Sequence, residues 1–387
     1  MLSRAFLFCV SGIAMAVALY ACGGNGGDSL TLVSPQNQLS TSTPIKHVVV
    51  IYNENVSFDH YFATYPNAAN PSGEPAFTAA AGTPAVNGLS GTQLTANPNF
   101  ANTANGTGAT NPFRLDRTQA ATADQNHAYT AEQQAYNSGK AGLFPKYTGK
   151  GSSGGAGAFG TTGQVMGYFD GNTVTAVWNY AQHYAMSDNA YTDTFGLSTP
   201  GALEVISGQN NGVQLVKISQ QPFNPTTASH SYHVNDGHGG VTLINDADPA
   251  NDLCSNSTDQ VLMSGKNIGD LLNAKNITWG GSNLSTTNSN GTTACKRSTV
   301  SPVVGQAMAD YIPHHNWFQY YNSTANPQHL RPSAATAIGS TLESGGKTVD
   351  PVNHQYDSDD FFASVKAGNY PSVSFIQAPV FQDGLAG

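Results

Sequence analysis

A β-branched apolar run over residues 45–52 predicts a strand near the start of the chain. Its apolar positions follow one another instead of alternating with polar ones, which is typical of a central strand buried on both faces of a parallel sheet. Polar residues follow at once, beginning with Asn53, Glu54 and Asn55. Ligands in open α/β sheets gather just beyond the carboxyl ends of strands. We therefore expect Glu54 and Asn55 to lie at a binding site.

Other segments show the periodicity of helices or strands. The predicted helices span residues 124–138, 173–184, 268–274 and 361–366, and the predicted strands span residues 277–279 and 373–376. A further helix is expected from Ser198, because Pro200 suits the first turn of a helix. Residues 66–112 and 139–162 have the composition of surface loops, and residues 211–262 that of a β-rich insertion. Strands alternating with helices predict a layered α/β fold.

The N-terminus has the pattern of an export signal. Arg4 precedes an apolar stretch that ends at Ala21 and is shorter than a membrane span needs. The sequence Leu-Tyr-Ala-Cys at residues 19–22 resembles a bacterial lipobox, in which the cysteine becomes lipidated. We expect residues 1–21 to be a signal peptide, Cys22 to carry a lipid anchor and residues 22–44 to form a flexible tether. A plain cleaved signal with an incidental cysteine is the alternative.

Composition and cysteine usage agree with an exported protein. The 387 residues include 15 Lys and Arg against 24 Asp and Glu, and this low content of cations argues against nucleic-acid binding. Cys9 lies in the signal and Cys22 in the lipobox, which leaves Cys254 and Cys295 as a pair. In an oxidising compartment such a pair is expected to form a disulfide. The expected location is the cell envelope, lipid-anchored in the periplasm or at the outer membrane, or the medium if the protein is secreted.

The candidate chemistry combines residues from distant parts of the chain. Glu54 and Asn55 could hold a hard cation, although taken alone they could equally form a capped turn. Ser198 precedes Thr-Pro and could simply cap a helix, and its neighbours do not form the Gly-x-Ser-x-Gly elbow of serine hydrolases. Together, a strand-end acid, a hydroxyl at a helix start and several histidines predict a metal-assisted phosphoester site. The candidate histidines are His127, His314 and His315.

A long signature over residues 45–62 contains Glu54-Asn55-Val56-Ser57-Phe58-Asp59-His60-Tyr61-Phe62. Further segments follow in order at residues 126–127, 187–209, 268–279, 313–321 and 371–376. In this arrangement the chain resembles the bacterial phosphoesterase family, which joins acid phosphatases and phospholipases C in the alkaline-phosphatase-like superfamily. The resemblance runs from Ile45 to the end of the chain. It implies a three-layer α/β/α sandwich in a phosphoesterase domain of residues 45–387.

The resemblance also implies roles for individual residues. Glu54, Asn55 and Ser198 would ligate one divalent metal ion of unspecified identity, and Ser198 would be the nucleophile. His127 would donate a proton to the leaving group, while His314 and His315 would line the phosphate pocket. Val56 and the Ser-Thr-Pro-Gly sequence at residues 198–201 look closer to the acid-phosphatase branch, which acts on small phosphomonoesters. The alternatives are a phospholipase C that acts on phosphatidylcholine-type lipids and a non-catalytic surface lipoprotein.

One departure from the family pattern concerns the end of the sequence. The family has a later Asp-Asp motif that completes the metal site, and this chain stops at Gly387 before such a motif. We therefore expect a C-terminally truncated member whose sandwich is incomplete and whose cation site carries little negative charge. Asp357, Asp359 and Asp360 precede a predicted helix and follow no predicted strand. They are expected to cap that helix and not to bind metal.

Overall fold

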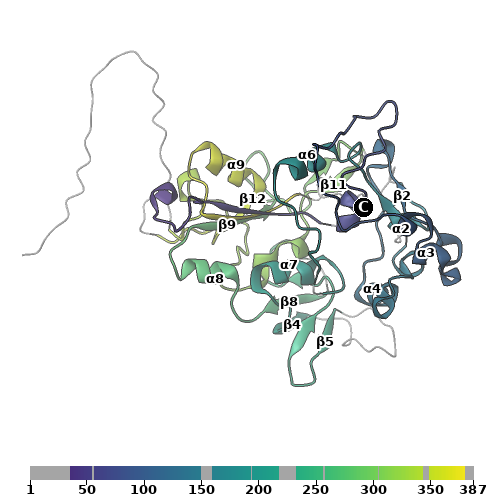
Figure 1. The fold of residues 1–387 in the computed structure, drawn as a ribbon. Helices are drawn as coiled ribbons and strands as arrows, with labels where there is room; N and C mark the ends of the chain where they lie inside the picture. Colours follow the sequence, from purple (N-terminus) through teal and green to yellow (C-terminus); the bar gives the residue numbers. More distant parts are fainter. Residues whose placement is uncertain are drawn as a thin grey trace, which may run out of the picture. The chain divides into compact units, whose positions relative to one another are not determined.

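The fold is built on a four-stranded sheet in which all strands run parallel (Figure 1). The computed structural model describes residues 35–54, 56–149, 159–192, 194–217, 232–255, 258–303, 305–342 and 348–379. The strands lie in the order β1 (Val48–Tyr52), β13 (Val373–Gln377), β9 (Trp279–Leu284) and β12 (Gln355–Asp357). Tyr52 pairs with Gln377, and Ile376 pairs with Ser282. Side chains that follow β1, β13 and β9 are therefore brought to one edge of the sheet.

Helices cover both faces of this sheet (Figure 1). On one face, α7 (Ser198–Ser207) and α8 (Ile268–Asn273) pack with the 3₁₀ helix η7 (Trp317–Tyr320) on apolar side chains of β9 and β13. On the other face, α9 (Ser358–Lys366) contacts β9 and β12. The structure is therefore a mixed α/β fold around a parallel sheet, as the alternation of elements predicts.

The position of β1 differs from the prediction. β1 is an edge strand of this sheet and not a central one. Val50 and Tyr52 pack on the core, whereas Val49 and Ile51 point the other way and are 39% and 73% exposed. On that side α9 reaches β9 and β12, and among the described residues no element buries Ile51. An unbroken apolar run did not mean burial on both faces here.

The remaining elements fall into three stretches. Between β1 and α7 lie α1 (Phe58–Phe62), α2 (Thr92–Thr95), α3 (Pro98–Ala101), η2 (Thr103–Gly108), β2 (Phe113–Arg114), η3 (Arg117–Gln119), α4 (Tyr129–Tyr136), η4 (Asn137–Gly139), α5 (Phe144–Tyr147), η5 (Gln164–Met166), β3 (Gly167–Tyr168) and α6 (Thr175–His183). Between α7 and β9 lie β4 (Val213–Lys217), β5 (His233–Asn235), β6 (Val241–Leu243), β7 (Asp248–Pro249), β8 (Gln260–Met263) and α8. Elsewhere lie η1 (Pro35–Gln38), β10 (Ser298–Val300), β11 (Ala307–Ala309), η6 (Pro313–His315) and η8 (Ala335–Ala337).

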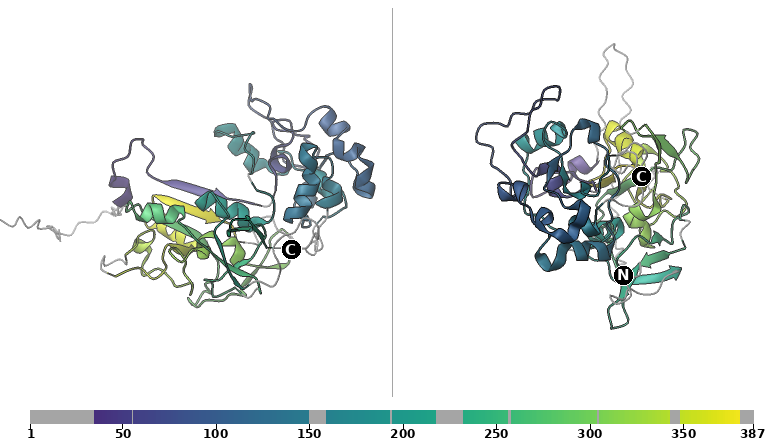
Figure 2. Two further views of the ribbon diagram at one scale, coloured as in Figure 1. Left: turned by 90° about the horizontal axis from the view of Figure 1, so that it is seen from below. Right: turned by 90° about the vertical axis from the view of Figure 1, so that its right-hand side faces the viewer.

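The segment between β1 and α7 is more structured than the sequence suggests (Figure 2). The expected loops over 66–112 and 139–162 contain α2, α3, η2 and α5. Trp178 of α6 is buried against Tyr65 and Phe77, and its indole N–H donates to the carbonyl of Tyr61. The predicted helix over 124–138 begins only at Tyr129. Its N-cap is Ala128 and not Asp124, so the segment before it stays extended.

Two local predictions agree with the structure. Cys254 and Cys295 form the expected disulfide. Asp357 is the N-cap of α9 and forms a capping box with Asp360, as predicted for these acids. The prediction that they follow no strand was wrong, because β12 ends at Asp357. Arg331 pairs with both carboxylates, which satisfies them without a metal ion.

The expected β-rich insertion does contain strands, in a β4-β8-β7 sheet and a β5-β6 hairpin. The signal peptide over residues 1–21, the lipidation site Cys22 and most of the tether over residues 22–44 lie outside the described residues. Among the helices that the structure does describe, none combines the length and apolar character needed to cross a membrane.

Candidate functional site

Glu54 and Ser198 come together at the carboxyl edge of the sheet. Glu54 lies two residues beyond β1, and Ser198 is the first residue of α7. The Ser198 hydroxyl lies close enough to the Glu54 carboxylate to lower the pKa of Glu54, against the effect of burial. Gln377, at the end of β13, donates its amide Nε2 to Glu54 Oε1 over 3.1 Å. The pairing of β1 with β13 therefore places the strand-end acid against the start of α7.

A glycine turn presents Ser198. Gly196 has φ of +114°, in the region that favours glycine, and a Cβ there would lie 2.7 Å from the carbonyl oxygen of Ile244. Its N–H donates to Glu132 Oε2 over 2.8 Å. The turn is therefore fixed by the hydrogen bond to Glu132, and the carbonyl of Ile244 leaves no room for a side chain at Gly196.

The N-terminus of α7 is satisfied by an acid that the sequence did not single out. The N-cap Leu197 offers no side-chain acceptor, and the N–H of Thr199 donates to Asp246 Oδ1 over 2.9 Å. Asp246 lies in the turn between β6 and β7. The free N–H groups of a ten-residue helix carry partial positive charge beside Ser198. This end of α7 can therefore bind a phosphate oxygen in addition to Asp246.

A cleft of about 680 Å³ opens over these residues. Its lining includes Glu54, Ser198, His127 and Glu132. His127 precedes α4 and is not on the helix, contrary to the prediction. Its Nδ1 lies 2.7 Å from the carbonyl oxygen of Gln125, and because a carbonyl only accepts, Nδ1 carries a proton. The other ring nitrogen, Nε2, is the atom that can exchange a proton with a bound group.

The neighbouring histidines occupy different environments. His315 Nδ1 lies 3.5 Å from Glu54 Oε1, and burial, followed by the charge of His314, lowers the pKa of His315 to about 3. Burial also opposes charge on His314, yet Asp246 and Asp248 outweigh it and raise its pKa. Neither ring lines the cleft, where the resemblance places both. They lie beside the cleft, with His315 against Glu54.

The oxygen donors around Glu54 fit a hard cation. Burial raises the pKa of Glu54, and the nearby hydroxyl of Ser198 works against that rise. Two nearby buried amide oxygens, Gln377 Oε1 and Asn283 Oδ1, have no hydrogen-bond donor in the described part of the chain. Carboxylate, hydroxyl and amide oxygens are the donors that Mg²⁺ and Ca²⁺ prefer. The predicted ligand Asn55 lies outside the described residues.

A second cluster of potential metal ligands lies away from the cleft. One ligand atom each from Asp252, Cys254 and His329 falls within 4.8 Å of the others, and all three residues are buried. The Cys254 sulfur is already in the disulfide, however, and His329 Nε2 pairs with Asp252 Oδ2 at 2.9 Å. With the disulfide closed there is no thiolate, and Tyr311 also hydrogen-bonds to Asp252. We describe this cluster as a hydrogen-bonded part of the core.

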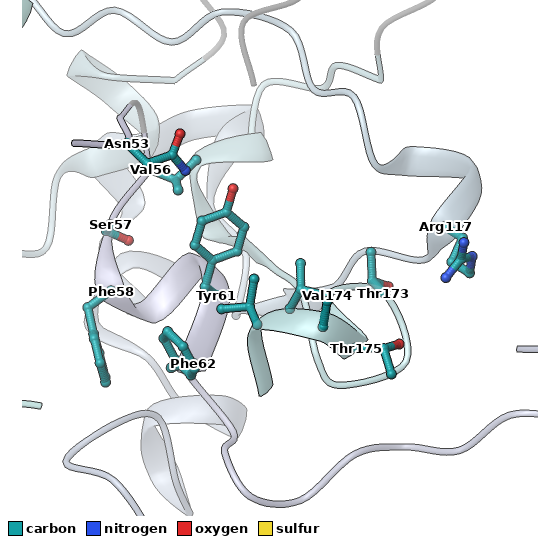
Figure 3. A pocket seen from close by; sticks show the side chains of 12 residues that line it. Asn53, Val56, Ser57, Phe58, Tyr61, Phe62, Arg117, Thr173, Val174 and Thr175 are labelled. Atoms are coloured by element: carbon teal, nitrogen blue, oxygen red, sulfur yellow. The ribbon is translucent and has the colours of Figure 1, made fainter. Parts of the chain in front are cut away.

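An apolar pocket adjoins the cleft (Figure 3). Its volume is about 580 Å³, and it shares Asn53, Val56 and Ser57 with the cleft. Half of its lining residues come from α1 and the start of α6, and Arg117 lies at the end opposite Asn53 (Figure 3). The pocket could hold an apolar group attached to a polar group in the cleft.

Sequence reasoning missed several residues of this site. Glu132, Asp246, Asp248 and Gln377 all contact a predicted site residue or the turn that presents it. The acids at 246 and 248, two residues apart in a polar turn, were the available signal. Nothing in the sequence connected that turn with Ser198.

The arrangement of acid, hydroxyl, helix N-terminus and histidine suits the hydrolysis of a phosphate ester. A model of the Phosphoesterase family matches residues 45–386, which is most of the chain and includes every described residue of the cleft. Membership of this family indicates a hydrolase whose substrate is a phosphoester. The chain therefore belongs to the Phosphoesterase family.

Proposed function

We propose that this protein is an acid-phosphatase-like enzyme that hydrolyses small phosphomonoesters through a phosphoserine at Ser198. The observation that supports this proposal most strongly is the closeness of Ser198 to the Glu54 carboxylate: both line the cleft, and the hydroxyl is near enough to lower the pKa of Glu54. A hydroxyl beside a carboxylate at a helix N-terminus has the proton acceptor and the anion-binding groups that phosphoryl transfer needs.

In the first step the Ser198 oxygen attacks phosphorus and the bond from phosphorus to the ester oxygen breaks. Glu54 would accept the hydroxyl proton, because its carboxylate is the acid that lies close to Ser198. The N-terminus of α7 lies beside the phosphoryl oxygens and stabilises their charge. The product of this step is phosphoserine and a free alcohol.

His127 is placed to protonate the departing alcohol from its Nε2 atom. The carbonyl of Gln125 holds Nδ1 and so orients the ring toward the cleft that it lines. In the second step a water molecule attacks the phosphoserine and passes a proton to His127, while Glu54 returns its proton to the oxygen of Ser198, which is released with inorganic phosphate. The two steps balance, since one ester bond and one water give one alcohol and one phosphate.

Glu54, Asn55 and Ser198 would hold one divalent cation, and the unpaired oxygen of Gln377 lies next to this set. Such an ion would add positive charge that favours the alkoxide of Ser198 and offsets the charge of the phosphate.

A panel of aryl and sugar phosphates, assayed with Mg²⁺, Ca²⁺, Mn²⁺ and Zn²⁺, tests the proposal. We expect turnover that Ser198→Ala abolishes. Ser207→Ala is the matched control, since Ser207 ends the same helix, does not line the cleft, and has its hydroxyl within hydrogen-bond distance of the carbonyls of Leu203 and Gln209. Hydrolysis that is equal in the two variants would contradict the proposal, and so would a wild-type protein that hydrolyses none of the esters. That last outcome would favour a non-catalytic surface lipoprotein.

A phospholipase C that acts on phosphatidylcholine-type lipids is the second candidate. The apolar pocket beside the cleft favours it, because lipid esters join a phosphate to an apolar group. A comparison of phosphatidylcholine vesicles with aryl phosphates separates the two. Release of phosphocholine at a rate above that of phosphomonoester hydrolysis would support the phospholipase.

We further propose export to the cell envelope, with residues 1–21 removed and Cys22 lipidated. The sequence around residues 19–22 supports this proposal. Mass spectrometry of the N-terminal peptide from cells tests it. We expect a diacylglyceryl-modified Cys22, and an unmodified N-terminus at another residue would contradict the anchor.

A further inference from the structure

His314 lies between two carboxylates that are two residues apart, one in the turn between β6 and β7 and the other at the start of β7. Asp246 Oδ2 is 3.5 Å from His314 Nε2, and Asp248 Oδ1 is 3.5 Å from His314 Nδ1. The side chains of His314, Asp246 and Asp248 are 25%, 14% and 8% exposed. The two acids therefore face opposite edges of a largely enclosed ring.

This arrangement selects one protonation state on geometric grounds. A neutral imidazole has one donor nitrogen and one acceptor nitrogen, whereas the imidazolium has two donors. A carboxylate opposite each nitrogen is satisfied on both sides only by the imidazolium. Glu54 adds negative charge nearby, and the ring of His315 lies beside that of His314, with the ring centroids 4.8 Å apart. The geometry therefore favours His314 as a cation, with a carboxylate facing each of its two N–H groups.

The same turn is tied to the nucleophile helix. Asp246 Oδ1 accepts the N–H of Thr199, and the Thr199 hydroxyl donates to the carbonyl of His314 over 3.0 Å. Thr199 is fully buried. Tyr320 donates its hydroxyl to the carbonyl of Ala247, over 2.6 Å, and so fixes the turn between the two acids. Three segments far apart in the sequence therefore meet next to Ser198.

We propose that Asp246 is a positioning residue for Ser198, because it joins the first turn of α7 to the His314 ring while Asp248 holds that ring from the other side. This inference rests on the proposed function of Ser198. It also changes the role that the resemblance implies for His314. A ring whose two N–H groups both face carboxylates supplies positive charge near the phosphate without donating a hydrogen bond to it.

Asp246→Asn is the test variant. Asparagine has the same shape and keeps an oxygen for the N–H of Thr199, but its NH₂ group then faces His314 Nε2 and favours an unprotonated nitrogen. We expect kcat to fall about 10- to 100-fold with KM changed by less than about threefold, since displaced catalytic groups slow the chemical step. Asp246→Glu, which keeps the charge, should recover part of that loss. Asp236→Asn is the matched control, because Asp236 is exposed in the β5-β6 hairpin and accepts hydrogen bonds from the backbone N–H groups of His238 and Gly240.

A double-mutant cycle with His314→Gln tests whether Asp246 acts through the ring. If it does, Asp246→Asn should lower kcat by less than about twofold when His314 is already absent. A loss of the same size in both backgrounds would overturn the inference, as would a wild-type kcat in Asp246→Asn. Thermal melting of each variant separates loss of folding from loss of positioning.

A spectroscopic measurement keeps the inference separate from the proposed function. In protein labelled with ¹⁵N-histidine, the His314 resonances are assigned by their loss in His314→Gln. We expect both ring nitrogens of His314 to be protonated at neutral pH in the wild type, and Nε2 to be unprotonated in Asp246→Asn. An unprotonated ring nitrogen in wild-type His314 would overturn the inference that Asp246 and Asp248 hold the ring as a cation. If the wild type hydrolyses no ester, the proposed function fails while this measurement still decides the state of His314.

Discussion

Replacement of Glu54 by Gln should change how the protein responds to divalent cations. Glu54 is only 9% exposed, and burial raises its pKa. A carboxyl whose pKa is raised on folding favours the folded state while protonated, and that contribution is lost as pH rises through the folded pKa. At neutral pH the charged Glu54 therefore destabilises the cation-free protein. Cation-free Glu54→Gln should melt at the same temperature as the wild type or above it.

A bound cation should reverse the order of the two melting temperatures, so that the wild type melts above Glu54→Gln. At a cation concentration of about 100 times Kd, binding to the folded state alone adds about 2.7 kcal/mol. For the roughly 340 residues of the matched region, an unfolding entropy of about 2.1 cal/mol/K per residue converts this to a rise of about 4 °C in Tm. Protons compete for the carboxylate, so the rise should shrink as pH falls from about 7.5 to about 5. The rise in Tm caused by the cation should be small in Glu54→Gln.

Differential scanning calorimetry with Mg²⁺, Ca²⁺ and Mn²⁺ measures this effect without any assay of activity. Asp236→Asn is the control, since it also removes one negative charge, from an exposed hairpin. It should keep the full response of the wild type. Equal shifts in the wild type and Glu54→Gln would refute the assignment of Glu54 as a cation ligand, and so would the absence of any shift in the wild type.

Three other substitutions test the framework around the site. Replacement of Cys254 and Cys295 by Ala, which opens a loop with a sequence separation of 41, should lower the free energy of unfolding by about 4 kcal/mol in urea titrations. Gly196→Ala should lower the free energy of unfolding by about 2 kcal/mol or more and also lower kcat, because the new Cβ would meet the carbonyl of Ile244. A stable and fully active variant would contradict the proposed turn geometry. Burial lowers the pKa of His354 to about 4, so its contribution to stability is present above about pH 6.5 and lost as pH falls toward 4. Between about pH 7.5 and about pH 4.5 the free energy of unfolding of His354→Phe should therefore fall by about 2 kcal/mol less than that of the wild type. An unchanged pH dependence would contradict this.

The strands were predictable because their apolar and β-branched residues follow one another in the sequence. The runs before Glu54 and around Phe375 became β1 and β13, and the acid expected beyond the first strand lies at the sheet edge where ligands bind. The neighbours of β1 were not predictable. An apolar run reports that a strand is apolar, but the number of elements that cover it depends on the rest of the fold, and Ile51 remains exposed.

The polar partners of the site were harder to predict than its main residues. Ser198 could be singled out because a glycine turn and a helix start surround it in the sequence. Asp246 contacts Thr199 only because the turn between β6 and β7 folds back on α7. The histidine pair was recognised, but its two environments depend on Asp248 and Glu54, which are distant in sequence. Such contacts are made by tertiary structure and leave no local pattern.

The most direct test of the central claim is to trap the phosphorylated enzyme. An aryl phosphate is mixed with the wild type, the reaction is stopped with acid within the first turnover, and peptides are analysed by mass spectrometry. The account predicts phosphate on Ser198, none in Ser198→Ala, and loss of turnover in that variant while Ser207→Ala behaves as the wild type. Turnover that continues in Ser198→Ala, or a phosphoryl group on another residue, would contradict it.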